Sequence, residues 1–208
     1  MYVVAYIFHS HIYIFLKKGV LNMEKRKIIN GFIINDGVIV GVFDTNITEA
    51  IIPDGITSIG INAFSGCTGL TNVSIPDTVT SIGDWAFVYC KSLTSINIPD
   101  SVTSIGEWAF SDCICLTSID IPDSVTSICS GTFDGCISLT SVNISNRVTS
   151  IGNYAFSGCT NLTSISIPNS VISIGKYAFW RCTSLTSINI PNSITSIGDH
   201  AFDGYKKV

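Results

Sequence analysis

Charged residues are scarce in this chain: they make up 12% of its 208 residues, against 46% for hydrophobic residues. The 11 lysines and arginines form no basic face, and the net charge is −4, so the chain lacks the basic surface that nucleic-acid binding requires. The high hydrophobic content excludes a disordered chain. Because charges are so few, serine, threonine and asparagine must cover most of the surface.

Histidine is also scarce, and His200 is the only histidine inside the region of repeats described below. No serine–histidine–aspartate set and no pair of carboxylates stands apart from repeated positions, and no glycine-rich loop is suited to a phosphate. Residues that occur at every repeat are explained by the fold. We therefore predict a protein that is not an enzyme and has no cofactor.

A long hydrophobic run is missing as well. Tyr2–Leu16 is apolar except at positions 9–11, and Lys17 and Lys18 follow it, whereas a secretory signal carries its basic residues first. As a helix this run would span about 22 Å, short of the ~30 Å hydrocarbon layer. We interpret residues 1–22 as an apolar leader outside the true protein, which then starts at Met23. A short membrane anchor through residues 2–16 is the alternative.

One motif is abundant instead, and it returns every 23 residues. Residues 93–113 read LTSINIPDSVTSIGEWAFSDC, residues 116–136 read LTSIDIPDSVTSICSGTFDGC, and residues 70–90 read LTNVSIPDTVTSIGDWAFVYC. The period is marked by seven phenylalanines: Phe64, Phe87, Phe110, Phe133, Phe156, Phe179 and Phe202. A fixed period of this length predicts a solenoid.

Each unit contains three local patterns. Ile96 and Ile98 alternate with polar residues, which predicts a strand over 93–98 that Pro99 ends. Residues 102–105 form a second extended piece, and the spacing of the apolar residues over 109–113 predicts a single helical turn. One unit alone cannot repay its conformational entropy, so the units must stack and align their strands into a parallel sheet.

A different pattern precedes the repeats. Two apolar runs, 32–34 and 38–40, flank Asn35-Asp36-Gly37, which is a strong hairpin turn signal. A solenoid needs a cap over its first coil. We therefore predict a hairpin cap over residues 23–50, followed by a solenoid of 23-residue units over 51–208.

The repeated pattern L-x-x-I-x-I-P-x-x-V-x-x-I-G-x-x-A-F-x-x-C resembles the BspA-type leucine-rich repeat of bacterial and protozoan surface antigens. The resemblance covers about residues 51–204, and the hairpin is similar to that family's N-terminal segment. It implies a curved, right-handed coil, mainly β with short helical turns, with a parallel sheet on one face. It also implies adhesion and protein binding at the cell surface or after secretion. The cytoplasm is the alternative, because residues 2–16 do not form a convincing signal.

Six of the eight cysteines follow the same period: Cys67, Cys90, Cys113, Cys136, Cys159 and Cys182. A disulfide ladder and a zinc site are the functional interpretations. Zinc needs ligands that converge on one point, which a single column does not provide. The column favours buried free thiols that act as small hydrophobes, and no metal site.

A second column, just before the repeated alanine, contains aromatic residues. The candidate binding stripe is Trp85, Trp108, Tyr154, Tyr177 and His200. Aromatic side chains dominate binding hot spots, so an exposed stripe could hold a glycan or a partner protein. Alternatively, the rings lie flat over the turns and shield the core.

Polar residues on the outward side of the strands are candidate sheet-face contacts: Thr94, Asn97, Thr117, Asp120, Thr140, Asn143 and Asn189. They could bind a ligand or only keep the sheet soluble. The residue after the proline position of the repeat is Asp up to Asp123 and Asn from Asn146 onward. Calcium could bind such carboxylates, but the replacement by Asn favours a turn role.

Two segments depart from the repeat, and we expect an irregularity at each: Cys129–Thr132, where Cys129 replaces glycine, and Ser145–Arg147. After the strand predicted at 185–190 no further strand follows, and an unpaired sheet edge is a template for association. We therefore expect self-association through this end.

We predict a non-enzymatic leucine-rich-repeat protein that binds a protein or a glycan, and the family resemblance implies a surface-adhesion module. The alternative is a passive structural or antigenic repeat protein with no dedicated ligand.

Overall fold

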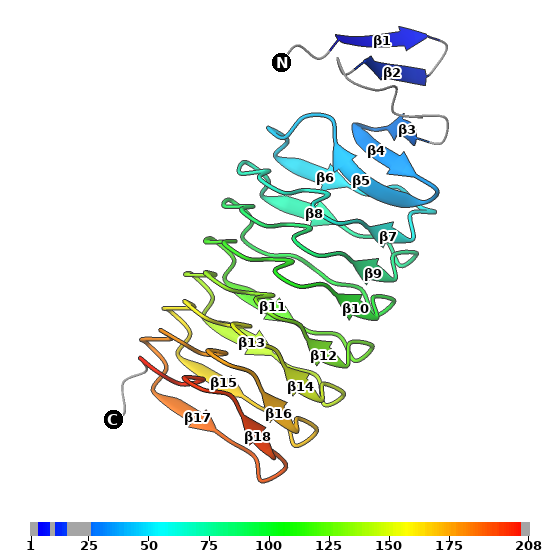
Figure 1. Ribbon diagram of the computed structural model, residues 1–208. Coiled ribbons are helices and arrows are strands. Elements are labelled where there is room, and N and C mark those ends of the chain that lie inside the picture. Colours follow the sequence, from blue (N-terminus) through cyan, green and yellow to red (C-terminus); the bar gives the residue numbers. More distant parts are fainter. Residues whose placement is uncertain (1–3, 9–10, 16–25, 205–208) are drawn as a thin grey trace.

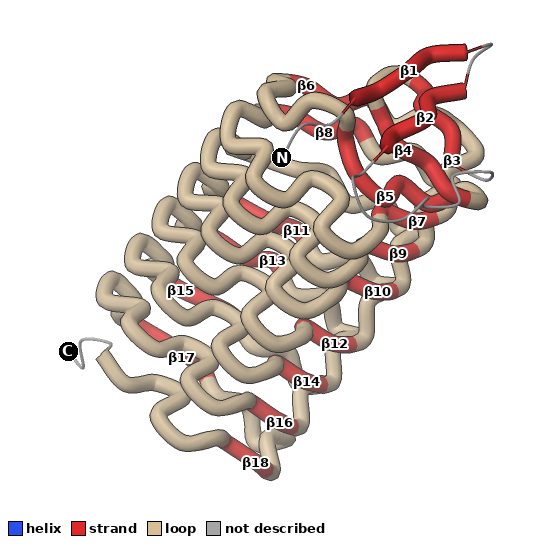
Figure 2. The backbone as a smooth tube through the Cα atoms, turned by 45° about the horizontal axis from the view of Figure 1, so that its top comes forward, coloured by secondary structure: helices blue, strands red, loops and turns tan. Residues whose placement is uncertain are grey.

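The computed structural model describes residues 4–8, 11–15 and 26–204 of the chain. The repeats form a solenoid whose coils stack along one axis, with two columns of short strands (Figure 1). The described residues contain no helix, and turns and loops join the strands (Figure 2). The prediction of a mainly β repeat solenoid with parallel strands is confirmed.

The first column comes from the L-x-x-I-x-I segments. Its middle residue is buried and its flanking polar residues are exposed in β8, β11, β13 and β15, as period-two alternation requires. The pairs β6–β8, β11–β13 and β15–β17 are parallel. The strands are β6 (Glu49–Ile51), β8 (Asn72–Ser74), β11 (Ser118–Asp120), β13 (Ser141–Asn143), β15 (Ser164–Ser166) and β17 (Ser187–Asn189).

One predicted strand of this column does not form. Residues 91–99 contain no strand, so the prediction of a strand over 93–98 is wrong for this copy. Ile96 and Ile98 are nevertheless buried, with 8% and 6% of their surface exposed. The alternation fixes which side chains enter the core, whereas strand pairing depends on how closely the neighbouring coils approach.

The second column comes from the V-T-S-I segments and, unlike the first, continues into the N-terminal cap. It forms two sheets, ordered β10-β9-β7-β5-β4-β3 and β12-β14-β16-β18; the repeat strands pair in parallel, and the first sheet also includes the antiparallel strands of the cap. The repeat strands are β7 (Ser58–Ile59), β9 (Ser81–Ile82), β10 (Ser104–Ile105), β12 (Ser127–Ile128), β14 (Ser150–Ile151), β16 (Ser173–Ile174) and β18 (Ser196–Ile197).

The N-terminal cap contains the predicted hairpin. β4 (Phe32–Asn35) and β5 (Val38–Val42) are antiparallel, and both turn residues have positive φ, 48° at Asp36 and 79° at Gly37. A third strand, β3 (Arg26–Ile29), was not predicted. β5 pairs in parallel with β7, so the hairpin continues the second column and covers the first coil.

The segment at the start of the chain forms two further strands. β1 (Val4–Phe8) and β2 (His11–Phe15) pair antiparallel, in place of the helix considered as an alternative. In the described part of the chain, no helix is long and apolar enough to cross a membrane. The predicted start at Met23 lies outside the described residues.

The phenylalanines form the centre of the core. Neighbouring rings from Phe64 to Phe202 stack with centroids 5.0–5.6 Å apart and planes within 12° of parallel. Phe32 of the cap closes the stack edge-on at 6.0 Å from Phe64. Like residues therefore lie over like residues along the solenoid.

The predicted helical turn at Ala-Phe-x-x-Cys is wrong. The amides of Trp108, Phe110 and Asp112 donate forward to the next coil, to the carbonyls of residues 130, 132 and 134, over 2.8–2.9 Å. A helix would direct them back along its own segment. Positive φ at Trp108 (55°) and Asp112 (56°) turns these amides toward the neighbour, so a third backbone ladder replaces the helix.

The second column is interrupted between β10 and β12. On either side of the break, the glycine amide bonds back one coil, Gly106 to Ile82 and Gly152 to Ile128, both over 2.8 Å. A Cβ at Gly152 would lie 2.6 Å from the Cys129 carbonyl carbon, so this column needs glycine for close approach. Cys129 carries a Cβ at the equivalent position, and the ladder opens there. The irregularity predicted at Cys129–Thr132 is confirmed.

This close approach predicts the effect of adding one methyl group. A Cβ at Gly83 would lie 2.8 Å from the Ile61 backbone nitrogen, so Gly83→Ala should lower the free energy of unfolding by about 2 kcal/mol. Gly69→Ala is the control, because its Cβ would meet the nearest atom, the Ile47 carbonyl oxygen, at 3.6 Å. Urea unfolding followed by circular dichroism measures both, and equal midpoints for the two variants would contradict the packing described.

Candidate functional site

Two positions in every coil have left-handed backbone conformation. One is the aromatic column, which includes Trp85 (φ 52°) and Trp108 (55°), and the other, four residues later, includes Tyr89 (61°) and Asp112 (56°). Glycine is unstrained at such positions, and the coil after Asp112 has glycine at both, Gly131 and Gly135. A side chain at such a position strains the backbone, and strained residues cluster at functional sites. Trp85, Tyr89, Trp108 and Asp112 are therefore candidate functional residues.

Most of the predicted stripe packs against itself. Tyr177 stacks between Tyr154 and His200 with ring centroids 5.0 Å apart on each side. Trp108 leans across Gly131, where a Cβ would overlap its indole ring, and reaches Tyr154 at 6.1 Å. Trp108, Tyr154 and Tyr177 are half-buried, so this part of the stripe covers the turns, as the alternative interpretation proposed.

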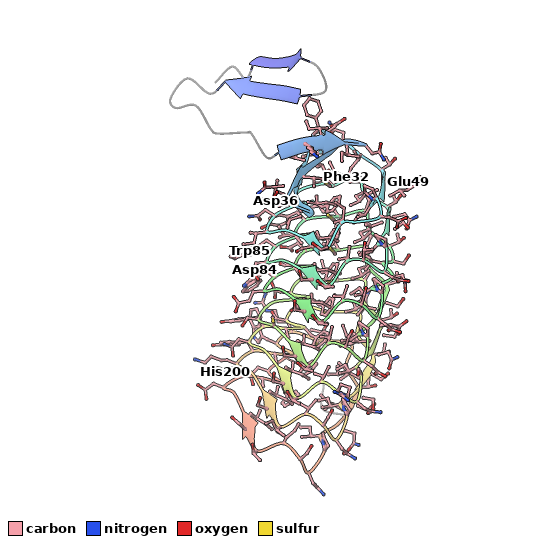
Figure 3. The ribbon with its side chains drawn as sticks, turned by 90° about the vertical axis from the view of Figure 1, so that its right-hand side faces the viewer. Phe32, Asp36, Glu49, Asp84, Trp85 and His200 are labelled. Atoms are coloured by element: carbon pink, nitrogen blue, oxygen red, sulfur yellow. The ribbon has the colours of Figure 1, made fainter. Side chains whose placement is uncertain are left out.

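Trp85 is different. Its side chain is 41% exposed, and nearby Tyr89 is 50% exposed. No ring contact joins Trp85 to Trp108 among those of the described residues, because Trp108 leans toward the following coil. Trp85 and His200 lie along the same side of the solenoid (Figure 3).

The gap between the two tryptophans is a groove of about 500 Å³. We call it the Trp85–Trp108 groove. It crosses four coils, whose backbones are fixed to one another by the forward ladder. It is lined by Asn62, Ser65, Trp85, Val88, Tyr89, Trp108, Ser111, Asp112 and Asp134.

Two carboxylates face this groove. A Cβ at Gly135 would lie 2.7 Å from an Asp112 carboxylate oxygen, so this glycine leaves room for Asp112 as Gly131 does for Trp108. Burial raises the pKa of the Asp134 carboxyl; a hydrogen bond with Ser157 lowers that pKa, and the negative charge of Asp112 raises it. The groove is therefore aromatic and negatively charged.

The candidate sheet-face residues lie as predicted, on the outside of the first column. Thr94, Asn97, Thr117, Asp120, Thr140, Asn143 and Asn189 are all exposed. Some of their hydroxyl groups already serve the fold: Thr117 Oγ1 donates to the Thr94 carbonyl over 3.2 Å, and Thr140 Oγ1 to that of Thr117 over 3.0 Å. This face is a row of internally bonded hydroxyls, whereas the Trp85–Trp108 groove offers exposed aromatic surface.

The cysteine column is buried and free of disulfides, as predicted. Each thiol from Cys90 to Cys182 donates to the phenylalanine carbonyl of the preceding coil, over 3.1–3.3 Å. Burial raises the pKa of these thiols, to about 12 at Cys182 and about 11 at Cys67. Such thiols are inert. In the described ranges, no three acidic, histidine or cysteine side chains are grouped to hold a metal ion.

The family model described as BspA type leucine rich repeat region (6 copies) matches residues 42–159 and 109–208. The chain belongs to this family. A search of the curated proteins found no match.

Solved bacterial structures share the fold of this BspA-type chain. A leucine-rich repeat protein of Bacteroides ovatus is 31% identical over 98% of this chain, with a TM-score of 0.78. The Treponema pallidum leucine-rich repeat protein is 32% identical, with a TM-score of 0.75, and the match covers 80% of each chain. A leucine-rich cell surface protein of Faecalibacterium prausnitzii is 36% identical over 93% of this chain, with a TM-score of 0.69. The chain spans 55% and 54% of the lengths of the Bacteroides and Faecalibacterium proteins.

Sequence reasoning about this BspA-type repeat found both tryptophans but not the carboxylates beside them. Asp112 and Tyr89 replace the glycine that most coils carry at this position, and Asp134 stands where Ser65, Ser111 and Ser157 stand in other coils. These departures from the repeat were the available signal. That they face one groove depends on Trp108 leaning over Gly131, which the sequence pattern does not indicate.

Proposed function

We propose that the chain is a non-enzymatic interaction module that binds a partner protein or a glycan through the Trp85–Trp108 groove. The observation that carries the proposal is the exposure of Trp85 and Tyr89 at 41% and 50%, at backbone positions where any side chain is strained. Exposed aromatic rings beside polar groups are typical of binding hot spots.

The family supports the same proposal. A structural relative is named as a cell surface protein, and we propose a location at the cell surface for this chain. The repeat positions offer no catalytic group: the six thiols in the column are buried, with raised pKa values, and the remaining polar side chains of the coils mostly serve the backbone.

The test uses residues that other coils already carry. Trp85→Asn copies Asn62, and Tyr89→Gly copies Gly66, so both substitutions suit the left-handed backbone. We expect the wild-type chain to bind on arrays of immobilised glycans and extracellular proteins, and the double variant to bind at least tenfold more weakly, because hot-spot aromatics contribute more than about 2 kcal/mol. Phe43→Ala, at another exposed ring, is the control.

Circular dichroism separates binding from folding in this test. Unchanged spectra with lost binding support the proposal. A wild-type chain that binds nothing on either array would contradict it and favour the passive repeat protein.

We also propose that the last described coil associates with a second copy of the chain. β17 and β18 each end their sheet among the described strands, and Ile190 and Ile197 are 39% and 48% exposed there. We expect the mass from light scattering to rise with concentration, and Ile197→Lys to abolish the rise. A constant monomer mass for the wild type at high concentration would contradict this.

A further inference from the structure

The Trp85–Trp108 groove is mainly aromatic and acidic. Its lining combines three aromatic rings with the carboxylates of Asp112 and Asp134, and Lys91 lies at its rim, over the ring of Tyr89. Aromatic ring faces carry negative electrostatic potential, so both kinds of group favour a cation.

The rings of this chain already attract its own cations elsewhere. Arg181 lies over Trp180 with its guanidinium carbon 4.1 Å from the ring centroid, and Lys176 lies 5.8 Å from that of Tyr177. At the groove itself, Lys91 lies over Tyr89 at 5.9 Å. Within the described chain, no cation lies over Trp85 or Trp108, so these two rings remain available to an external one.

The two carboxylates have hydroxyl partners: Ser111 Oγ donates to Asp112 Oδ2 over 3.5 Å, and Ser157 hydrogen-bonds to Asp134. Asp112 and Asp134 are on adjacent coils, joined by the bond from the Asp112 amide to the Asp134 carbonyl over 2.8 Å. Burial, and to a lesser extent the negative charge of Asp112, raises the pKa of Asp134. A bound cation would relieve the repulsion between the two carboxylates, whereas a neutral sugar would not. The chain's net charge of −4 would also steer a basic partner toward it.

We propose that the Trp85–Trp108 groove binds an arginine side chain presented by a basic partner protein. The planar guanidinium can stack on an indole and hydrogen-bond to a carboxylate at the same time, which the ammonium of lysine cannot match. The inference rests on the proposed function and names the chemistry of the partner at the same site.

The test uses fluorescein-labelled acetyl-tetra-arginine amide, with tetra-citrulline as the neutral probe of the same shape. Fluorescence anisotropy at about 50 mM salt, where surface charges are weakly screened, should show binding of the arginine peptide alone. Asp112→Asn combined with Asp134→Ser should weaken that binding roughly tenfold. Trp85→Asn should weaken it about threefold or more.

The matched control changes net charge equally away from the groove. Asp100→Asn with Asp123→Asn alters two exposed turn residues that do not line the groove and should leave affinity within about twofold. Unchanged urea midpoints show that all variants fold. Equal weakening by both pairs, or equal binding of the citrulline probe, would overturn the inference.

The same anisotropy assay is repeated with an oligosaccharide probe, a labelled tetramer of N-acetylglucosamine. If this binds in a Trp85-dependent manner while tetra-arginine does not, the arginine inference fails and the proposed function stands. If tetra-arginine, the oligosaccharide and the protein arrays all fail to bind, both proposals fail.

Discussion

Raising the pH from 8.5 to about 10.5 should unfold this protein. Burial raises the pKa values of Cys90, Cys113, Cys136, Cys159 and Cys182, while the same thiols ionise near pH 8.5 in the unfolded chain. Between these pH values the unfolded state binds fewer protons than the folded state, so stability is complete below pH 8.5 and falls as pH rises. About one pH unit above that value the unfolded thiols are almost fully ionised, and five of them then give a loss approaching about 7 kcal/mol per pH unit.

Urea unfolding at several pH values measures this slope. A free energy of unfolding of about 5–15 kcal/mol would fall to near zero within roughly two pH units. Cys136→Ala should lower the slope by about 1.4 kcal/mol per pH unit, since one thiol fewer titrates. A free energy of unfolding that stays constant from pH 8.5 to 10 would show that the thiols are not buried in the core.

Truncating one ring in the middle of the phenylalanine stack should have the largest effect of any single substitution. Phe133 is fully buried and stacks on Phe110 at 5.6 Å and on Phe156 at 5.4 Å. Phe133→Ala removes both contacts and leaves a cavity, so we expect a loss of about 3–5 kcal/mol. The site also lies beside the interruption between β10 and β12, where neighbouring coils are already less tightly joined.

Because coils contact only their neighbours, this variant should also separate the two halves of the solenoid. We expect two urea transitions where the wild type shows one, followed by circular dichroism. Phe43→Ala, at a ring that is 59% exposed, should change stability by less than about 0.5 kcal/mol. A loss below about 1 kcal/mol for Phe133→Ala would contradict the stacked core.

The sequence predicted the solenoid because its period fixes which residues superimpose, and the phenylalanine and cysteine columns follow from that alone. It failed where backbone conformation decides the outcome. The spacing of Ala109, Phe110 and Cys113 is the same for a helical turn and for the forward ladder observed, and only positive φ at Trp108 and Asp112 distinguishes them.

The candidate site was predicted in part for the same reason. The aromatic column was evident, but its division into a packed stack and an exposed Trp85 was not. That division depends on Gly131, which lets Trp108 lean away from Trp85, and on Gly135, which leaves room for Asp112. A missing side chain in one coil thus opens a groove between the two before it.

The distance between spin labels on equivalent turn residues tests the stacking of coils most directly. The two native cysteines outside the column, Cys115 and Cys129, are first replaced by serine. Cysteines for labelling then replace exposed residues after the proline position, in the pairs Asp77/Asn169, Asp54/Asn169 and Asp54/Asn192. At about 4.8 Å per coil, double electron–electron resonance should give about 19, 24 and 29 Å for four, five and six coils. Distances that do not increase in even steps with the number of intervening repeats would contradict the stacked solenoid.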